Sequence, residues 1–249
     1  MSAPAAKPAW LRDVLGDVTG RGVSVGLVDS GRDPDWEEPR IRPGWGLVGR
    51  QLDLVESSDD RDRLGHGTAA ADVLLRLAPG VEIHPLRVFG DRLETSPEVV
   101  EAALDRAVER ELSIVNLSLG TTRESAAPRF EAACARAHGA GMVVVAAAPR
   151  GPGPRYPASL PTVLGVTAGR FASPYDLRHR PDHAVAWQAQ GEARVRWLGG
   201  ELRRVHASSL AAPHLTALAA LLLERFPGAG PDDLRRLLVA LAERAAAAG

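Results

Sequence analysis

Three polar residues stand where an apolar run ends or a helical pattern begins. Asp29 follows a run of apolar residues, His66 opens a helical pattern, and Ser209 lies at the start of a long apolar segment. Each residue alone has an ordinary explanation, as a turn former, an incidental histidine or a helix N-cap. Together they supply the carboxylate, imidazole and hydroxyl that acyl transfer through a covalent intermediate requires. The three positions therefore predict a nucleophilic site.

The surroundings of Ser209 suit this chemistry. A serine at a helix N-terminus lies beside free backbone N–H groups and the positive end of the helix dipole, and both stabilise an oxyanion. Residues without bulky side chains allow close approach of the backbone segments that carry the three candidates. Such residues flank both His66 and Ser209: Gly65, Gly67, Ala207 and Ala211.

Strand and helix patterns alternate along the chain and must position these residues. Fully apolar strands separated by helices are typical of a parallel sheet covered on both faces, with its sites at the carboxyl ends of the strands. Because no linker or repeat interrupts the order, we expect one domain over residues 1–249, with a core over 22–226. The predicted strands are 23–28, 81–89, 114–119, 142–148 and 163–166, with further strands and a hairpin over 184–205. The predicted helices are 66–77, 96–110, 128–139, 208–226 and a C-terminal helix over 231–248.

The composition excludes several kinds of chemistry. The 249 residues include one cysteine (Cys134), one lysine (Lys7) and one asparagine (Asn116). A single cysteine excludes an intrachain disulfide framework and a multi-cysteine zinc site. A single lysine nearly excludes a Schiff base or a lysine general base. Any role that needs an asparagine side chain must fall on Asn116.

Charge and hydropathy exclude several partners. Thirty basic and thirty-one acidic residues give a net charge of −1, so we expect no nucleic-acid partner. No apolar run approaches the roughly 20 residues of a membrane span, so we expect no membrane partner. Calcium needs about six to eight oxygen ligands in a fixed loop, and no such spacing occurs, so we expect no metal and no cofactor. We expect the grouped acidic residues to be solvated loop charges: Asp33, Asp35, Asp59, Asp60 and Asp62.

Several segments resemble the subtilisin-like serine peptidases, or subtilases, and they occur in the order of that family. In the nucleophile motif, Ala207-Ser208-Ser209-Leu210-Ala211-Ala212-Pro213-His214 matches the family's Gly-Thr-Ser-x-Ala-x-Pro-His. The resemblance implies a three-layer α/β sandwich with a mostly parallel sheet of about seven strands and helices on both faces. The other matching segments are VSVGLVDSG (23–31), GHGTAAADVL (65–74), VNLSLG (115–120), VVVAAA (143–148) and YPASLPTVLGVTA (156–168).

The resemblance also implies roles for individual residues. Asp29 would orient His66, His66 would act as the general base, and Ser209 would attack the scissile carbonyl. Ser118, Leu119 and Gly120 match the segment that pairs with the substrate backbone as an added strand. Ala146, Ala147 and Ala148 match part of the wall of the pocket for the residue before the scissile bond. His214 also follows the family motif, where its role is structural.

The chain departs from the family at the oxyanion position. The family continues Ala-Gly-Asn after the apolar strand, and that asparagine donates to the oxyanion, whereas this chain has Pro149-Arg150 there. Asn116 cannot replace it because it belongs to another strand motif. Loss of one such donor costs roughly 3–4 kcal/mol, or about 10²–10³ in turnover. Ser208 and Arg150 are the auxiliary candidates. The Arg150 guanidinium either donates in place of asparagine or lies on the surface of a rebuilt, proline-rich loop over 149–157.

The first functional hypothesis is a serine endopeptidase that hydrolyses peptide bonds through an acyl-enzyme on Ser209. We expect it to be slow, narrow in specificity, cytoplasmic and active in the maturation of a peptide or protein partner. The alternatives are a catalytically weak or inactive domain that binds a peptide or protein, and an acyl-transfer ligase or cyclase. The cytoplasmic expectation rests on the lone cysteine and on the absence of a signal peptide or long propeptide before the first predicted strand. The sequence indicates neither the cleavage preference nor the oligomeric state.

Overall fold

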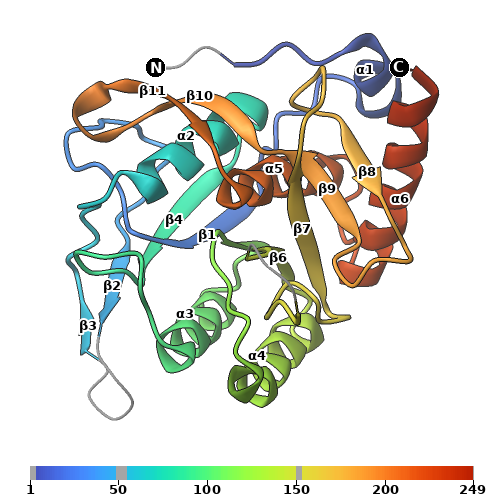
Figure 1. Cartoon of the computed structure of the whole chain (residues 1–249). Coiled ribbons are helices and arrows are strands. Elements are labelled where there is room, and N and C mark those ends of the chain that lie inside the picture. The colour runs from blue at the N-terminus through green and yellow to red at the C-terminus, as the bar shows by residue number, and fades with distance from the viewer. Residues whose placement is uncertain (1–3, 49–54, 150–152, 249) are drawn as a thin grey trace.

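The computed structural model describes residues 4–48, 55–149 and 153–248, and a nine-stranded sheet runs through its centre (Figure 1). The strands are β1 (Ser24–Asp29), β2 (Trp45–Val48), β3 (Val55–Ser57), β4 (Glu82–Arg87), β5 (Ile114–Leu117), β6 (Val143–Ala147), β7 (Val163–Gly169), β8 (Leu177–His179) and β9 (Trp187–Gln190). Their spatial order is β3-β2-β4-β1-β5-β6-β7-β9-β8. In this spatial order, the seven inner strands from β2 to β9 run parallel to one another. The outermost strands, β3 and β8, each pair antiparallel with their neighbour. The predicted, mostly parallel sheet is confirmed, and the described residues form nine strands of it where about seven were expected.

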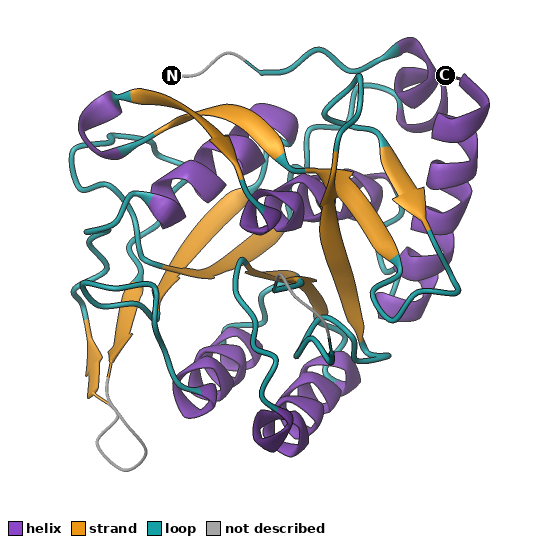
Figure 2. Cartoon of the chain, in the orientation of Figure 1, coloured by secondary structure: helices purple, strands orange, loops and turns teal. Residues whose placement is uncertain are grey.

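Helices cover both faces of this sheet, as Figures 1 and 2 show. The helices α3 and α4 lie on one face, and α2 and α5 lie on the other with α1 and α6 packed beside α5. Each face has its own buried core, so the predicted three-layer sandwich is confirmed. The bounds are α1 (Ala9–Leu15), α2 (His66–Leu77), α3 (Pro97–Glu109), α4 (Ala127–Gly139), α5 (Ala211–Arg225) and α6 (Pro231–Ala248).

The apolar pattern of β1 follows from this double cover. Val25 and Leu27 pack into the core beneath α2 and α5, whereas Val28 packs into the core beneath α3. Because both faces are buried, the strand is continuously apolar and does not alternate with polar residues. Such a strand can end on a charged residue only where that residue finds partners, and β1 ends on Asp29.

The periodic elements match their predicted bounds closely. The helix over 66–77 has the predicted bounds, and the apolar segment 208–226 divides into a 3₁₀ turn, Ser208–Leu210, followed by α5. Sequence reasoning missed α1, β2, β3 and β8. Each of these spans seven residues or fewer, too few for a clear period.

The predicted hairpin forms a separate two-stranded sheet over α2. Its strands are β10 (Glu192–Arg196) and β11 (Leu202–His206), joined through a turn at Leu198–Gly200 in which both glycines have a positive φ. The Arg196 N–H donates to Asp72 of α2 at 3.0 Å, and the Arg76 guanidinium donates to the Arg194 carbonyl at 2.6 Å. The hairpin is therefore fixed to the helix that begins with His66.

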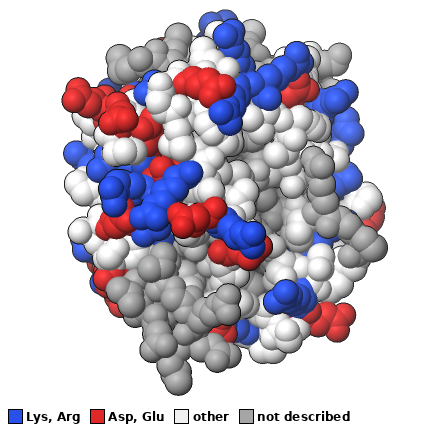
Figure 3. Space-filling view, turned by 60° about the vertical axis from the view of Figure 1, so that its left-hand side comes forward, with Lys and Arg blue, Asp and Glu red and all other residues white. Residues whose placement is uncertain are grey.

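The prediction that the acidic loop residues are solvated is wrong for three of them. Asp33, Asp60 and Asp62 are buried, and backbone N–H groups of Gly199, Gly44 and Thr68 donate to them in that order. Elsewhere basic and acidic side chains lie next to one another, as the face in Figure 3 shows. Examples are the Arg61–Asp59 pair at 2.8 Å and the Arg203–Glu201 pair at 2.6 Å.

Candidate active site

The end of β1 and the start of α2 bring Asp29 and His66 into contact. Asp29 is fully buried, and one of its carboxylate oxygens, Oδ1, lies 2.7 Å from Nδ1 of His66. The same oxygen accepts the Ser30 N–H at 2.7 Å. A carboxylate held this way fixes the imidazole ring and keeps a proton on Nδ1, which leaves Nε2 free to act as a base.

Close packing at two glycines holds His66 in this position. The Gly67 N–H donates to the Ser30 hydroxyl at 2.8 Å, and a Cβ on Gly67 would lie 2.3 Å from the Gly31 carbonyl oxygen. Gly65 has a φ of +80° and lies against the indole of Trp197, so that a Cβ there would be 2.2 Å from the ring. Larger residues cannot occupy either position without moving α2.

The 3₁₀ turn before α5 completes the set. Nε2 of His66 lies 2.9 Å from Oγ of Ser209. This turn contacts α2 and the strands β6 and β7, so Ser209 lies near the carboxyl ends of the parallel strands. Asp29, His66 and Ser209, which the sequence places 37 and 143 residues apart, thus form one continuous hydrogen-bonded series.

The surroundings of His66 raise its pKa. Burial of the ring opposes protonation and lowers the pKa, but the negative charge of Asp29 and its hydrogen bond outweigh burial, and Asp62 adds to their effect. The pKa of His66 therefore lies above its ordinary value. A raised pKa makes the imidazole a stronger base for the Ser209 hydroxyl once the ring is neutral.

Asp62 supports the start of α2, a role that sequence reasoning missed. One carboxylate oxygen accepts the N–H groups of Leu64 and Gly65 at 2.9 and 2.8 Å. The other accepts the N–H and the hydroxyl of Thr68 at 2.9 and 2.7 Å. The carboxylate thereby satisfies N–H groups of the first turn and places negative charge at the helix N-terminus. The Asp-x-x-Gly-His spacing before the helix was the available signal.

Asn116, the sole asparagine, is a structural residue in the described fold. It is fully buried on β5, donates to the Ser118 hydroxyl at 2.9 Å, and accepts the Thr216 hydroxyl of α5 at 2.9 Å. These bonds tie the end of β5 to the helix that follows Ser209. Asn116 lies on β5, and the strand that ends at Ala147 is β6, so the two belong to different strands, as predicted.

The two predicted substrate-binding segments lie beside each other. A Cβ on Gly120 would lie 3.1 Å from the Ala147 carbonyl oxygen and 2.9 Å from the Pro149 ring. Ser118 is buried, Leu119 is half-buried and Gly120 is exposed. The alanines at 146–148 are all buried, and Ala146 and Ala148 face the α3 and α4 side of the sheet, opposite to Ala147.

The comparisons with known proteins agree with this geometry. The family model described as "Subtilase family" matches residues 20–249. The chain belongs to the subtilase family.

Known subtilases resemble this one over most of its length. It is 27% identical over 235 residues to the thermostable alkaline protease of Halalkalibacterium halodurans. This alignment covers 88% of this chain and 62% of that protein. It is 24% identical over 225 residues to subtilisin E of Bacillus subtilis, covering 84% of this chain and 57% of that protein. The chain thus spans about three fifths of the length of these two curated relatives.

Solved structures share the fold. Sphericase aligns with a TM-score of 0.73 at 20% identity, covering 95% of this chain and 90% of the other. A lanthipeptide protease aligns with a TM-score of 0.68 at 19% identity, covering 87% and 78%.

Two auxiliary residues, Ser208 and Arg150, are predicted at the oxyanion position of this subtilase. Arg150, the residue that stands in place of the family asparagine, lies outside the described residues. Ser208 is half-buried at the start of the 3₁₀ turn, directly before Ser209.

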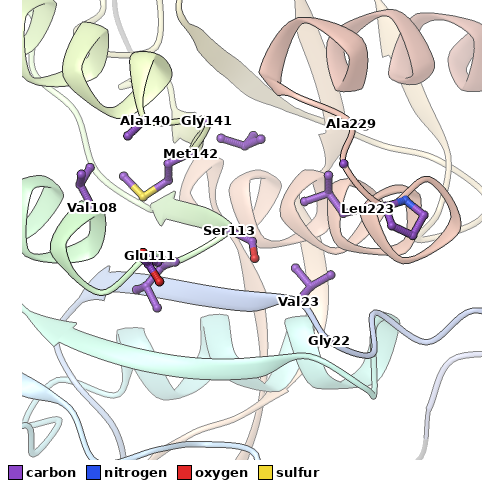
Figure 4. A pocket seen from close by; sticks show the side chains of 14 residues that line it. Gly22, Val23, Val108, Glu111, Ser113, Ala140, Gly141, Met142, Leu223 and Ala229 are labelled. Atoms are coloured by element: carbon purple, nitrogen blue, oxygen red, sulfur yellow. The ribbon is translucent and has the colours of Figure 1, made fainter.

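An open pocket of about 610 Å³ lies at the amino-terminal ends of the central strands, away from Asp29, His66 and Ser209 (Figure 4). Val23, Ser113 and Met142 line it at the amino-terminal ends of β1, β5 and β6, and Leu223 lines it from the end of α5. Since Asp29 and Ser209 lie at the carboxyl ends, this pocket is separate from the candidate active site. Within the described ranges there is no group of three or more His, Cys, Asp or Glu placed to hold a metal ion. No helix there is long and apolar enough to cross a membrane.

Proposed function

We propose that this chain is a serine endopeptidase that hydrolyses peptide bonds through an acyl-enzyme on Ser209. The observation that carries the proposal is the series Asp29–His66–Ser209, with contacts of 2.7 and 2.9 Å. In this mechanism Nε2 of His66 takes the proton of Oγ as that oxygen attacks the scissile carbonyl. The resulting imidazolium is stabilised by Asp29 and then protonates the leaving amine. A water molecule, activated by the same imidazole, releases the acyl group and restores the serine.

The backbone of the substrate would pair with Ser118, Leu119 and Gly120 as an added strand. The oxyanion would be stabilised by the Ser209 N–H at the start of the helix, with Ser208 and Arg150 as the auxiliary candidates. The alanines at 146–148 would form part of the wall for the residue before the scissile bond. Small buried residues at the end of β6 support this assignment.

We further propose a slow protease of narrow specificity that acts in the cytoplasm on a peptide or protein partner. The missing asparagine donor supports slow turnover, and the single cysteine, Cys134, buried on α4, is compatible with a reducing compartment. Arg150→Asn tests the first point, because it restores the side chain that the family uses. We expect kcat to rise by up to about 10²-fold. The control is Arg150→Ala, which removes the guanidinium without adding a donor, and an equal rise in both variants would contradict the proposal.

A fluorophosphonate probe, which reacts with activated serines, tests the main proposal. We expect the probe to add to Ser209 in the wild type, and expect Ser209→Ala and His66→Ala to lose both labelling and peptide hydrolysis. Mass spectrometry of the digested protein identifies the modified residue. A folded wild-type protein that neither reacts with the probe nor cleaves a peptide library would refute the proposal.

That negative result would favour the second candidate, a catalytically weak domain that binds peptides, for which the missing donor is the supporting observation. Peptide binding that survives Ser209→Ala would then be expected. Product mass distinguishes the third candidate, a ligase or cyclase, because hydrolysis adds one water molecule and acyl transfer to an amine does not.

A further inference from the structure

The register of β6 and β7 places two small side chains on one face of the sheet near the candidate site. Ala147 pairs with Val166, and both side chains face α5. The alternation of a strand therefore places Ala148 and Thr167 together on the opposite face, at the carboxyl end of β6. The Ala148 N–H donates to the Val166 carbonyl at 2.8 Å, which holds these neighbours in place.

The segment 155–158 crosses this same face. A Cβ on Gly165 would coincide with the Ala158 carbonyl oxygen, so Ala158 lies directly on β7. Tyr156 exchanges two backbone hydrogen bonds of 2.8 Å with Thr121, the residue that follows Gly120. The proposed substrate strand, the end of β6 and the segment 155–158 therefore surround one region.

Two arginines reach this region from different elements. Nη2 of Arg180, the residue after β8, donates to the Thr167 hydroxyl at 3.0 Å. Arg155 begins the segment 155–158 and is held by the Ser159 hydroxyl, which donates to its carbonyl at 2.9 Å. Both side chains are half-buried. Burial lowers the pKa of Arg180, and the positive charges of Arg178 and Arg155 lower it further.

This concentration of positive charge is unusual for the protein. Many of its other arginines form ion pairs, such as Arg32–Asp60 at 2.8 Å and Arg136–Asp105 at 2.9 Å. Between described residues, neither Arg178 nor Arg180 forms an ion pair. Asp176, which is close in sequence, is engaged by the Ser173 N–H at 3.0 Å.

We propose that Arg180, supported by Arg155, selects a substrate with an aspartate or glutamate directly before the scissile bond. The inference rests on the proposed peptidase function and names its substrate class. An acidic side chain that enters between the substrate strand and β7 meets the half-buried guanidinium of Arg180, which binds a carboxylate through charge-assisted hydrogen bonds. The carboxylate also stabilises the charged form of Arg180, which burial and the neighbouring positive charges disfavour.

Peptides that differ only in charge at this position test the inference. The substrates are Ala-Ala-Pro-X p-nitroanilides with X = Glu, Gln, Ala, Leu or Lys, and glutamine has the shape of glutamate without its charge. We expect kcat/KM for Glu to exceed that for Gln by about tenfold or more, since a charge-assisted contact is worth roughly that factor. We expect Lys to be the poorest substrate, and added salt to reduce the preference for Glu.

Arg180→Gln should abolish the preference for Glu over Gln, and Arg180→Lys should retain part of it. The matched control is Arg225→Gln, which removes the same charge from an exposed arginine at the end of α5. The rate of fluorophosphonate labelling at Ser209 reports whether each variant is folded. A wild type that is labelled but prefers Gln, Ala or Leu to Glu would overturn the inference and leave the proposed function standing.

If neither labelling nor cleavage occurs, the proposed function fails, and binding then tests the recognition separately. The probes are fluorescently labelled Ala-Ala-Pro-X peptides with a free C-terminal carboxyl group and X = Glu or Gln. The Ser209→Ala protein is titrated into each peptide, and binding is followed by fluorescence anisotropy. Tighter binding of Glu that is lost in Ser209→Ala/Arg180→Gln supports the inference. Equal binding of the two peptides, or a preference that survives Arg180→Gln, overturns it.

Discussion

His66 and Asp29 show how one contact determines both geometry and protonation. The Asp29 charge and hydrogen bond raise the pKa of His66 against the effect of burial. The neutral ring is the active base, so kcat/KM should rise as pH increases through the raised pKa. Asp29→Asn keeps the shape but removes the charge, and we expect kcat to fall by about 10⁴-fold. The rise in kcat/KM should also move to lower pH, which a pH–rate profile measures. An unchanged profile would show that Asp29 does not set the protonation of His66.

Residues with motif neighbours could be predicted from the sequence, whereas residues with distant partners could not. The positions of Asp29, His66 and Ser209 at the ends of apolar elements were sufficient to group them before any coordinates were known. The prediction that Asp62 is solvated is wrong because composition gives no sign of the four hydrogen bonds that it accepts, and the Asp-x-x-Gly-His spacing before the helix is the only local signal. The role of Asn116 depends on Thr216, 100 residues away. Three-dimensional proximity of that kind leaves no local pattern.

At the scale of elements, the long buried helices and strands were predictable and the short edge elements were not. Helical periodicity predicts α2, and a continuous apolar run predicts β6, because the helix is buried along one face and the strand is buried on both. The edge strands β3 and β8 have three residues each, and backbone pairing with a neighbour creates them without any apolar period. The start of α5 as a 3₁₀ turn also has no signal in composition. That turn positions Ser209, so the least predictable backbone lies where the chemistry is expected.

The buried His214 of α5 predicts a pH dependence of stability. Complete burial lowers its pKa to about 4, although its hydrogen bond to the Leu210 carbonyl partly opposes this. In the unfolded chain His214 is therefore protonated below about pH 6.5, whereas in the folded protein it stays neutral down to about pH 4. Stability should be lost over this window as pH falls, by about 3 kcal/mol from this residue.

His214→Asn checks this prediction because the amide nitrogen of asparagine takes the place of Nδ1, can donate to the same carbonyl and does not titrate. Denaturant unfolding at pH 7 and at pH 4 should show a smaller loss of unfolding free energy in the variant than in the wild type, by about 3 kcal/mol. Equal losses in both proteins would show that His214 titrates normally in the fold.

At the scale of the whole molecule, the two core layers share one sheet, and distant segments close the structure around it. The Tyr175 hydroxyl donates to the carbonyls of Ala5 and Leu77, which joins the N-terminal segment to α2 and to the region before β8. The hairpin β10–β11 is fixed to α2 in a similar way. Because every layer contacts the same sheet, we expect the domain to unfold as one unit.

Glu224 joins the N-terminal segment to α5 and should stabilise the fold without taking part in the chemistry. Its Oε2 accepts the N–H groups of Thr19, at 2.6 Å, of Gly20, and of Arg21, at 2.8 Å, across about 200 residues of sequence. Hydrogen bonds to a charged acceptor contribute more than neutral ones, so Glu224→Gln should lower the free energy of unfolding by about 2 kcal/mol. Fluorophosphonate labelling of Ser209 under native conditions should be unchanged, because α5 separates the two residues by about 22 Å along its axis. Glu243→Gln, at an exposed position on α6, is the matched control and should leave the unfolding free energy within about 0.5 kcal/mol of the wild type. If folded Glu224→Gln protein lost fluorophosphonate labelling, the hydrogen bonds of Glu224 to the N-terminal segment would instead affect Ser209 through α5.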